Sequence, residues 1–178
     1  MECKLRQWKV EDAASLANSI NNKKVQDNLR DGIPYPYTQK DAKDYINQML
    51  EAYQNEIFAF AIVAGDQVVG SIAVSRKDNI HHRTGELGYY IGEPFWGKGY
   101  GTSAVKQMCR YIFLNTDIIR IFAEPFAYNI PSCRILEKNG FTCEGILRSN
   151  AVKNGCILDM KMYSLIKADC QIEDALNI

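Results

Sequence analysis

The sequence predicts an α/β (α+β) protein whose early strands are joined mostly by hairpins. Ile57–Val63 is a nearly unbroken apolar run, and Val68–Val74 is a second one behind a four-residue turn. Strand-type and helix-type patterns then alternate, and the dipeptide Asn154-Gly155 is a strong hairpin signal. Because hairpins supply most of the early connections, we expect a mixed, mostly antiparallel central sheet flanked by helices rather than a doubly wound parallel one.

Length and charge narrow the class of protein. The chain has 178 residues, of which 47% are hydrophobic and 24% charged, and its formal net charge is zero. We expect a single domain over residues 1–167 followed by a short acidic tail over 168–178. A neutral chain argues against a nucleic-acid partner held by bulk charge. No apolar stretch reaches 18 residues, so we expect no membrane partner.

The cysteines and histidines predict no metal site. None of the six cysteines forms a C-x-x-C pair, and only His81 and His82, in a polar segment, offer imidazole. Cys109 and Cys133 fall in helical patterns and are expected to be small buried hydrophobes. No signal peptide is visible, so we expect free thiols and a cytoplasmic location.

The N-terminal third predicts one strand followed by helices. Lys4–Lys9 has a short strand pattern, and a helix opens at Glu11 and Asp12 with apolar residues through Ile20. The polar run Asn21–Lys24 breaks that helix, and Val25–Leu29 is expected to add one more turn. Asp31–Tyr37 holds two prolines and is therefore a loop.

A capping box and a helix precede the apolar hairpin. Thr38 and Asp41 have the spacing of a capping box, and apolar residues continue at helical spacing as far as Tyr53. After the hairpin, Arg76–Arg83 is polar, and Gly85–Gly92 is expected to be a strand.

A glycine-rich turn, Trp96–Thr102, separates that strand from an amphipathic helix that carries Ala104 and Phe113. The first amides of a helix lack internal partners, and glycines let a phosphate approach them closely. The turn is therefore a candidate pyrophosphate site. It matches neither the P-loop nor the dinucleotide-binding spacing. The alternative is a turn that only permits tight strand–helix contact.

The remaining elements are a strand over Ile118–Ala123, a helix over Asn129–Asn139, and strands over Phe141–Arg148 and Cys156–Ile166. The helix has a good N-cap residue in Asn129 and a proline in its first turn, and Gly140 follows its end.

The sequence resembles the GNAT N-acetyltransferase superfamily, most closely the branch of ribosomal-protein N-terminal acetyltransferases. The resemblance covers about residues 4–167. It is carried by the strand Gly85–Gly92, the turn Trp96–Thr102, the helix and following residues Asn129–Phe141, and the closing Asn154-Gly155 with Asp159. It implies a sheet of about seven strands with a splay between the fourth and fifth, and an acetyl-CoA co-substrate. Many relatives dimerise, so a homodimer is also expected.

The resemblance also implies which residues bind acetyl-CoA. Its pyrophosphate is expected at the backbone of Trp96, Gly97, Lys98, Gly99, Tyr100, Gly101 and Thr102. Trp96 stands where the family more often has Gln or Arg, which a site built from backbone amides tolerates. Tyr90, Ile91 and Asn129 are expected along the pantetheine arm.

Two residues are implied as catalytic. The helix tyrosine that protonates the leaving thiolate in many relatives is Leu136 here, and Ser132 is the replacement expected in this branch. Glu86 is the expected general base, with a solvated strand charge as its alternative. For Ser132 the alternative is a local hydrogen bond at the helix start.

The acceptor is a primary amine whose identity the sequence leaves open. Tyr35, Tyr37 and Tyr53 are expected to line its pocket, with ordinary aromatic packing as the alternative. Protein N-termini and small-molecule amines both fit. A non-catalytic acyl-CoA-binding regulator is the competing function, supported by Leu136 and opposed by Glu86 and Ser132.

Overall fold

The computed structural model describes residues 2–52 and 56–170 and contains one seven-stranded sheet in the order β1-β2-β3-β4-β5-β7-β6. Only the β4–β5 pair is parallel. The mixed, mostly antiparallel sheet is therefore confirmed. The strands are β1 (Lys4–Arg6), β2 (Ile57–Ala64), β3 (Gln67–Arg76), β4 (Thr84–Ile91), β5 (Arg120–Ala123), β6 (Thr142–Lys153) and β7 (Cys156–Ile166).

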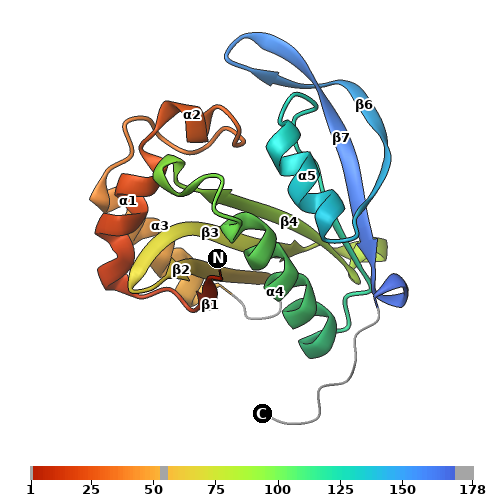
Figure 1. The fold of residues 1–178 in the computed structure, drawn as a ribbon, viewed down its shortest axis with the longest axis horizontal. Helices are drawn as coiled ribbons and strands as arrows, with labels where there is room; N and C mark the ends of the chain where they lie inside the picture. The colour runs from red at the N-terminus through yellow and green to blue at the C-terminus, as the bar shows by residue number, and fades with distance from the viewer. Residues whose placement is uncertain (1, 53–55, 171–178) are drawn as a thin grey trace.

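Helices cover both faces of the sheet (Figure 1). The α-helices are α1 (Ala13–Ile20), α2 (Lys23–Gln26), α3 (Gln39–Glu51), α4 (Tyr100–Asn115) and α5 (Ile130–Lys138); short 3-10 turns are η1 (Val10–Asp12), η2 (Asn79–His81), η3 (Glu93–Phe95) and η4 (Lys167–Asp169). One core cluster joins α4 and α5 to the sheet through residues such as Ile62 and Met108. A second cluster joins α1 and α3 to the opposite face through Ala61 and Ile46. Neighbouring residues of β2 enter different clusters because side chains alternate across a strand.

Several element boundaries differ from the sequence prediction for local reasons. The first strand ends at Arg6 instead of Lys9, because Lys9 precedes a 3-10 turn and its amide donates to Asp12 at 2.9 Å. Asn22, predicted within a helix break, is the N-cap of α2: its side chain accepts from the amides of Lys24 and Val25. The predicted turn Val25–Leu29 therefore begins earlier, at Lys23.

The capping box at Thr38 and Asp41 is confirmed, with the Asp41 amide donating to Thr38 Oγ1 at 3.2 Å and the Thr38 amide donating to Asp41 at 2.8 Å. The fifth strand begins at Arg120 rather than Ile118. Tyr53 and residues 171–178 of the expected tail lie outside the described residues, and the domain boundary at residue 167 stays a prediction.

The last two strands form a hairpin that extends beyond the helices (Figure 1). The Asn154-Gly155 turn has φ of 50° and 75°, the left-handed pair expected for a tight hairpin. The sixth strand runs to Lys153 instead of ending at Arg148. An irregular stretch around Ser149, with φ of 52°, interrupts its register, and the Ser149 amide donates to Asp159 Oδ1 at 2.7 Å.

Candidate active site

A splay between β4 and β5 organises the candidate site. The two parallel strands share the register Thr84–Arg120, Gly85–Ile121 and Glu86–Phe122, and β5 ends one residue later at Ala123. β4 continues to Ile91, paired only with β3. Its peptide groups beyond Glu86 therefore leave an open edge toward β5, where another molecule can hydrogen-bond. The expected splay is confirmed.

The glycine turn lies directly beyond β4, and its backbone is left-handed at two points. Gly97 has φ of 74°, and Gly99, the N-cap of the 16-residue helix α4, has φ of 81°. A side chain built on Gly97 would meet nothing within 4 Å, so the space beside this backbone is open. Residues from Trp96 to Gly99 are exposed. The turn thus offers accessible helix-start amides to an anion.

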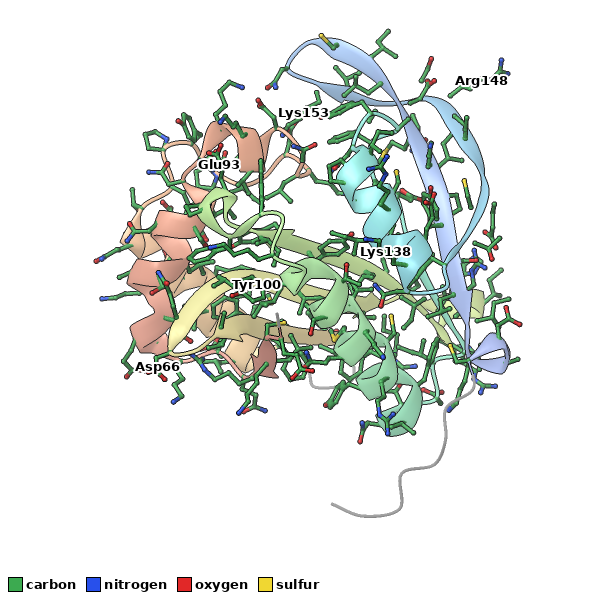
Figure 2. The ribbon with its side chains drawn as sticks, viewed as in Figure 1. Asp66, Glu93, Tyr100, Lys138, Arg148 and Lys153 are labelled. Carbon is green, nitrogen blue, oxygen red and sulfur yellow. The ribbon has the colours of Figure 1, made fainter. Side chains whose placement is uncertain are left out.

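The side chains of Trp96 and Lys98 contact residues next to the glycine turn. The Trp96 indole N–H donates to the Ile91 carbonyl at 2.6 Å and so ties the turn to the end of β4. The Lys98 ammonium lies 5.4 Å from the centre of the Phe95 ring. Tyr100 begins the first turn of α4 (Figure 2), and Thr102 follows within it.

Gly101 has a packing role that sequence reasoning did not find. A Cβ on Gly101 would lie 2.8 Å from Cδ1 of Ile135 on α5. The absence of a side chain therefore allows α4 and α5 to approach each other. The tight packing at Gly101 is therefore between two helices, not the strand–helix contact of the sequence alternative, while the open, left-handed Gly97 fits the phosphate interpretation.

Asn129 and Ser132 stand at the start of α5. The Asn129 side chain accepts from the Ser132 amide at 3.2 Å, so its expected N-cap role is confirmed. The Ser132 hydroxyl lies 2.9 Å from the Tyr89 hydroxyl of β4. Ser132 is half-buried, and its side chain bonds across to β4 rather than only to its own helix. This contact places the start of α5 beside the part of β4 that has left β5.

Adjacent tyrosines of β4 point to opposite faces. Tyr89 packs against the core cluster of α4 and α5, whereas Tyr90 packs against the cluster of α1 and α3. Burial raises the pKa of both phenols well above the ordinary value. Because the Tyr90 side chain packs on the face toward α1 and α3, a molecule in the splay would contact its backbone N–H or C=O at the open edge of β4.

Glu86 is the last β4 residue paired with β5, and its carboxylate is held by two cations. Arg30 Nη2 lies 2.5 Å from Oε1, and Lys77 Nζ lies 3.3 Å from Oε2. Arg30 also contacts Glu124 at 3.3 Å, just beyond β5. The Glu86 side chain is only 18% exposed. The alternative of a freely solvated strand charge therefore does not describe it.

The segment Asp27–Asp31, which follows α2, reaches across to the β6–β7 hairpin. Lys153 donates to Asp31 at 2.7 Å, and the Asn154 amide donates to Asp27 at 2.9 Å. Tyr128, in the loop before α5, donates to the Asp27 carbonyl at 2.9 Å. In Figure 2 Lys153 lies on the part of the hairpin that faces α2. Arg30 therefore belongs to a segment that is anchored to the hairpin and to the loop before α5.

Of the predicted acceptor tyrosines, Tyr35 and Tyr37 lie in different environments. Tyr35 lies in the loop before α3 and is 60% exposed. Tyr37 is buried in the α1–α3 core cluster, and this burial raises its pKa to about 12. Packing is therefore the better description of Tyr37. Tyr53 lies outside the described residues.

The histidines and cysteines stay outside the site. His81 and His82 are exposed at η2, and Cys109 and Cys133 are buried in the core, as expected. Residues 2–52 and 56–170 contain no group of three or more His, Cys, Asp or Glu side chains arranged to hold a metal ion. Among the same residues, no helix has the length and apolar character needed to cross a membrane.

Sequence reasoning missed four residues of this site: Arg30, Lys77, Tyr89 and Glu124. A signal existed for Tyr89, because strand alternation places it on the same face as Leu87 and Ile91, toward the helix that carries Ser132. Arg30 and Glu124 lie 94 positions apart and meet only in the folded chain. Nothing local in the sequence marks them.

Comparison with known proteins identifies the class of enzyme. A sequence model described as "Acetyltransferase (GNAT) domain" matches residues 3–142. An uncharacterised N-acetyltransferase p20 of Bacillus licheniformis is 29% identical over 93% of each chain. The ribosomal-protein-serine acetyltransferase of Escherichia coli is 25% identical over 60% of this chain and 59% of that protein. A crystal structure of spermidine N-acetyltransferase from Vibrio cholerae, with CoA and spermine, has a TM-score of 0.78 at 21% identity over 94% and 96% of the two chains.

The chain is an acetyltransferase of the GNAT family. The family match covers most of the chain. The residues present also fit a CoA-type molecule on structural grounds alone. The open, left-handed turn at the start of α4 suits a pyrophosphate, and the free edge of β4 suits the amides of a pantetheine arm.

Proposed function

We propose that this protein transfers the acetyl group of acetyl-CoA directly to a primary amine, and that the acceptor is an α-amino group such as a protein N-terminus. One observation carries the proposal: β4 connects all the parts. Glu86 stands where the strand leaves β5, Tyr89 binds Ser132, and the Ile91 carbonyl binds the glycine turn. β4 thus carries the proposed base and contacts both the proposed hydroxyl donor on α5 and the proposed anion site in the glycine turn.

The chain's residues divide the chemistry between them. Glu86 takes the proton that the attacking amine loses, directly or through water. The Ser132 hydroxyl donates a hydrogen bond to the thioester sulfur as that atom gains charge. The backbone of Trp96–Thr102 binds the pyrophosphate, and Asn129 lies along the pantetheine arm. Acetyl-CoA supplies the activated acetyl group and a thiolate leaving group.

A single proposed base suits an α-amine better than a lysine side chain. That base, Glu86, is paired with Arg30 and Lys77. At about pH 7.4 an α-amine with a pKa near 7.8 is roughly a quarter to a third neutral, whereas lysine is roughly 0.1% neutral. The difference is about 3.5 kcal/mol, which an α-amine does not require the enzyme to offset.

A thiol-release assay with acetyl-CoA and a panel of amines tests the proposal. The panel holds a peptide with a free N-terminus, the same peptide with a blocked N-terminus and an internal lysine, and a polyamine. We expect turnover with the free N-terminus and little with the blocked peptide. Preference for the polyamine would replace the α-amine with a small-molecule acceptor. CoA binding without thiol release from any amine would support the alternative of a regulatory acyl-CoA-binding module.

The proposal includes a cytoplasmic location, a homodimer, and no nucleic-acid or membrane partner. Six free thiols and a net charge of zero support the location and the lack of a nucleic-acid partner. Fractionation of cells that express a tagged chain, and sedimentation of the purified protein, test the location and the assembly.

A further inference from the structure

The Tyr89 hydroxyl contacts two atoms of Ser132, a residue in the first turn of α5. It lies 2.9 Å from Ser132 Oγ and 3.3 Å from the Ser132 carbonyl oxygen. From the other side, Asn129 Oδ1 accepts from the Ser132 amide at 3.2 Å. Ser132 is therefore held between its own N-cap and a strand residue. The proposed function above uses only its hydroxyl and assigns no role to Tyr89.

The number of hydroxyl protons limits how Tyr89 and Ser132 can hydrogen-bond to each other. The two hydroxyl groups carry one proton each, and the Ser132 carbonyl can only accept. If Tyr89 donates to Ser132 Oγ, the serine keeps its own proton for another acceptor. If Tyr89 donates to the carbonyl, the Ser132 hydroxyl donates its proton to the tyrosine oxygen and has none left for another acceptor. At 2.9 Å the Tyr89 hydroxyl is within donating distance of Oγ, and the carbonyl at 3.3 Å is the more distant acceptor, so the geometry permits the first arrangement.

Tyr89 also stays a donor under ordinary conditions. Its ring packs against the core cluster of α4 and α5, and this burial raises the pKa of the phenol, so it remains protonated at neutral pH. A tyrosinate in that place would be costly. Tyr89 is therefore suited to holding a hydrogen bond rather than to giving up a proton during turnover.

We infer that Tyr89 is a positioning residue that holds the Ser132 hydroxyl with its proton directed into the splay, toward the position of the thioester sulfur. The inference rests on the proposed function. In the reaction the nitrogen–carbon bond forms, the carbon–sulfur bond breaks, and its electron pair stays on sulfur. The amine proton goes to Glu86, Ser132 donates a hydrogen bond to the sulfur, and no proton leaves Tyr89.

Tyr89→Phe removes only the hydroxyl and is the direct test. A neutral hydrogen bond contributes about 0.5–1.5 kcal/mol, so we expect kcat to fall by about two- to twelvefold. The KM for acetyl-CoA should stay nearly constant, because the bond to sulfur strengthens only as charge develops. Tyr45→Phe is the matched control: the Tyr45 hydroxyl lies 3.3 Å from Ser71 Oγ in the part of the core that faces α1 and α3. That variant should keep the wild-type kcat.

A double-mutant cycle with Ser132→Ala separates positioning from a general effect on the fold. We expect Tyr89→Phe to cause no further loss when Ser132 is already alanine. An equal loss in both backgrounds would make Tyr89 a structural residue and overturn the inference, and this comparison holds even if Tyr89→Phe lowers the melting temperature. A slow Ser132→Ala enzyme with a fully active Tyr89→Phe enzyme would overturn the inference alone. A fully active Ser132→Ala enzyme would instead overturn the role of Ser132 in the proposed function.

Discussion

The two faces of β4 carry different kinds of chemical group. Toward α4 and α5, Tyr89 meets Ser132, and the glycine turn offers backbone amides, so this face works with neutral groups. Toward the opposite face, Glu86 meets Arg30 and Lys77, so this face works with full charges on long side chains. In the proposed function the thioester binds from the first face and the amine approaches from the second, so that the two meet in the splay beside β4.

The origin of the residues differs as well. The neutral face comes from one continuous stretch, from β4 to the start of α5. The charged face is gathered from the segment after α2, the end of β3 and the residue after β5. A face made of backbone and short hydroxyls depends on local conformation, whereas a face made of ion pairs depends on the complete tertiary structure. Variants on each face should therefore affect different steps.

The largest effect is expected for Glu86→Gln on the charged face. Removing a general base typically costs about 10²–10⁴-fold, so kcat should fall by that amount while CoA affinity stays unchanged. The acid limb of the rate–pH profile should disappear. Rate–pH profiles and calorimetric titration with CoA provide the check. An acid limb that survives in the variant would belong to the amine or to another group.

Gly99→Val should have the next largest effect, on binding at the neutral face. A β-branched residue is strained at φ of 81°, and its side chain stands where the pyrophosphate is expected. We expect CoA to bind about a hundredfold more weakly, or about 2.8 kcal/mol, by calorimetry. Trp96→Ala should weaken binding much less, because its indole serves the turn and not the phosphate.

Gly65→Val is the matched control for Gly99→Val. Gly65 has φ of 60° in the β2–β3 turn, and a side chain there meets nothing within 4 Å. This variant should carry the backbone strain and lose stability without losing CoA affinity. Equal CoA affinity of wild type and Gly99→Val would remove the phosphate-binding role of the turn.

Ser132→Ala should slow turnover by roughly 10–100-fold, since a hydrogen bond to a charged acceptor is worth roughly 1.5–3 kcal/mol. The effect should appear in kcat more than in the KM for acetyl-CoA. A thermal melt is the control, because Ser132 also belongs to the first turn of α5. Loss of activity in step with loss of the folded state would assign the hydroxyl to helix stability.

Arg30→Met gives the smallest and most discriminating effect. Arg30 is 62% exposed, so the free energy of unfolding should change by no more than about 1 kcal/mol. Removing one of the two cations that hold the Glu86 carboxylate lets that side chain move, so kcat in steady-state assays should fall by a small factor while CoA affinity stays unchanged. Lys77→Met should lower kcat less, because its contact is longer. Weaker CoA binding in either variant would show that the two faces are not separate.

The neutral face could be predicted from the sequence, and the charged face only in part. Glycine spacing, the N-cap Asn129 and the alternation of β4 are local signals, and each corresponds to an observed feature. Glu86 could be found from the strand that carries it. Its partner Arg30 could not, because an arginine in a loop has no periodicity and its contact lies 56 positions away in the sequence. The same reason accounts for Tyr37, whose burial depends on how α1 and α3 meet.

The anchoring of Asp27–Asp31 also determines which part of the molecule should open first. Its links to the hairpin join residues 122 and 127 positions apart, through exposed polar contacts rather than buried apolar ones. Contacts of this kind lie at the low-stability end of a protein, whereas β4 lies inside the sheet. Backbone amides in this segment should therefore exchange with deuterium well before those of β4. The segment that carries Arg30 would then open locally, beside the proposed amine site, while β4 stays ordered.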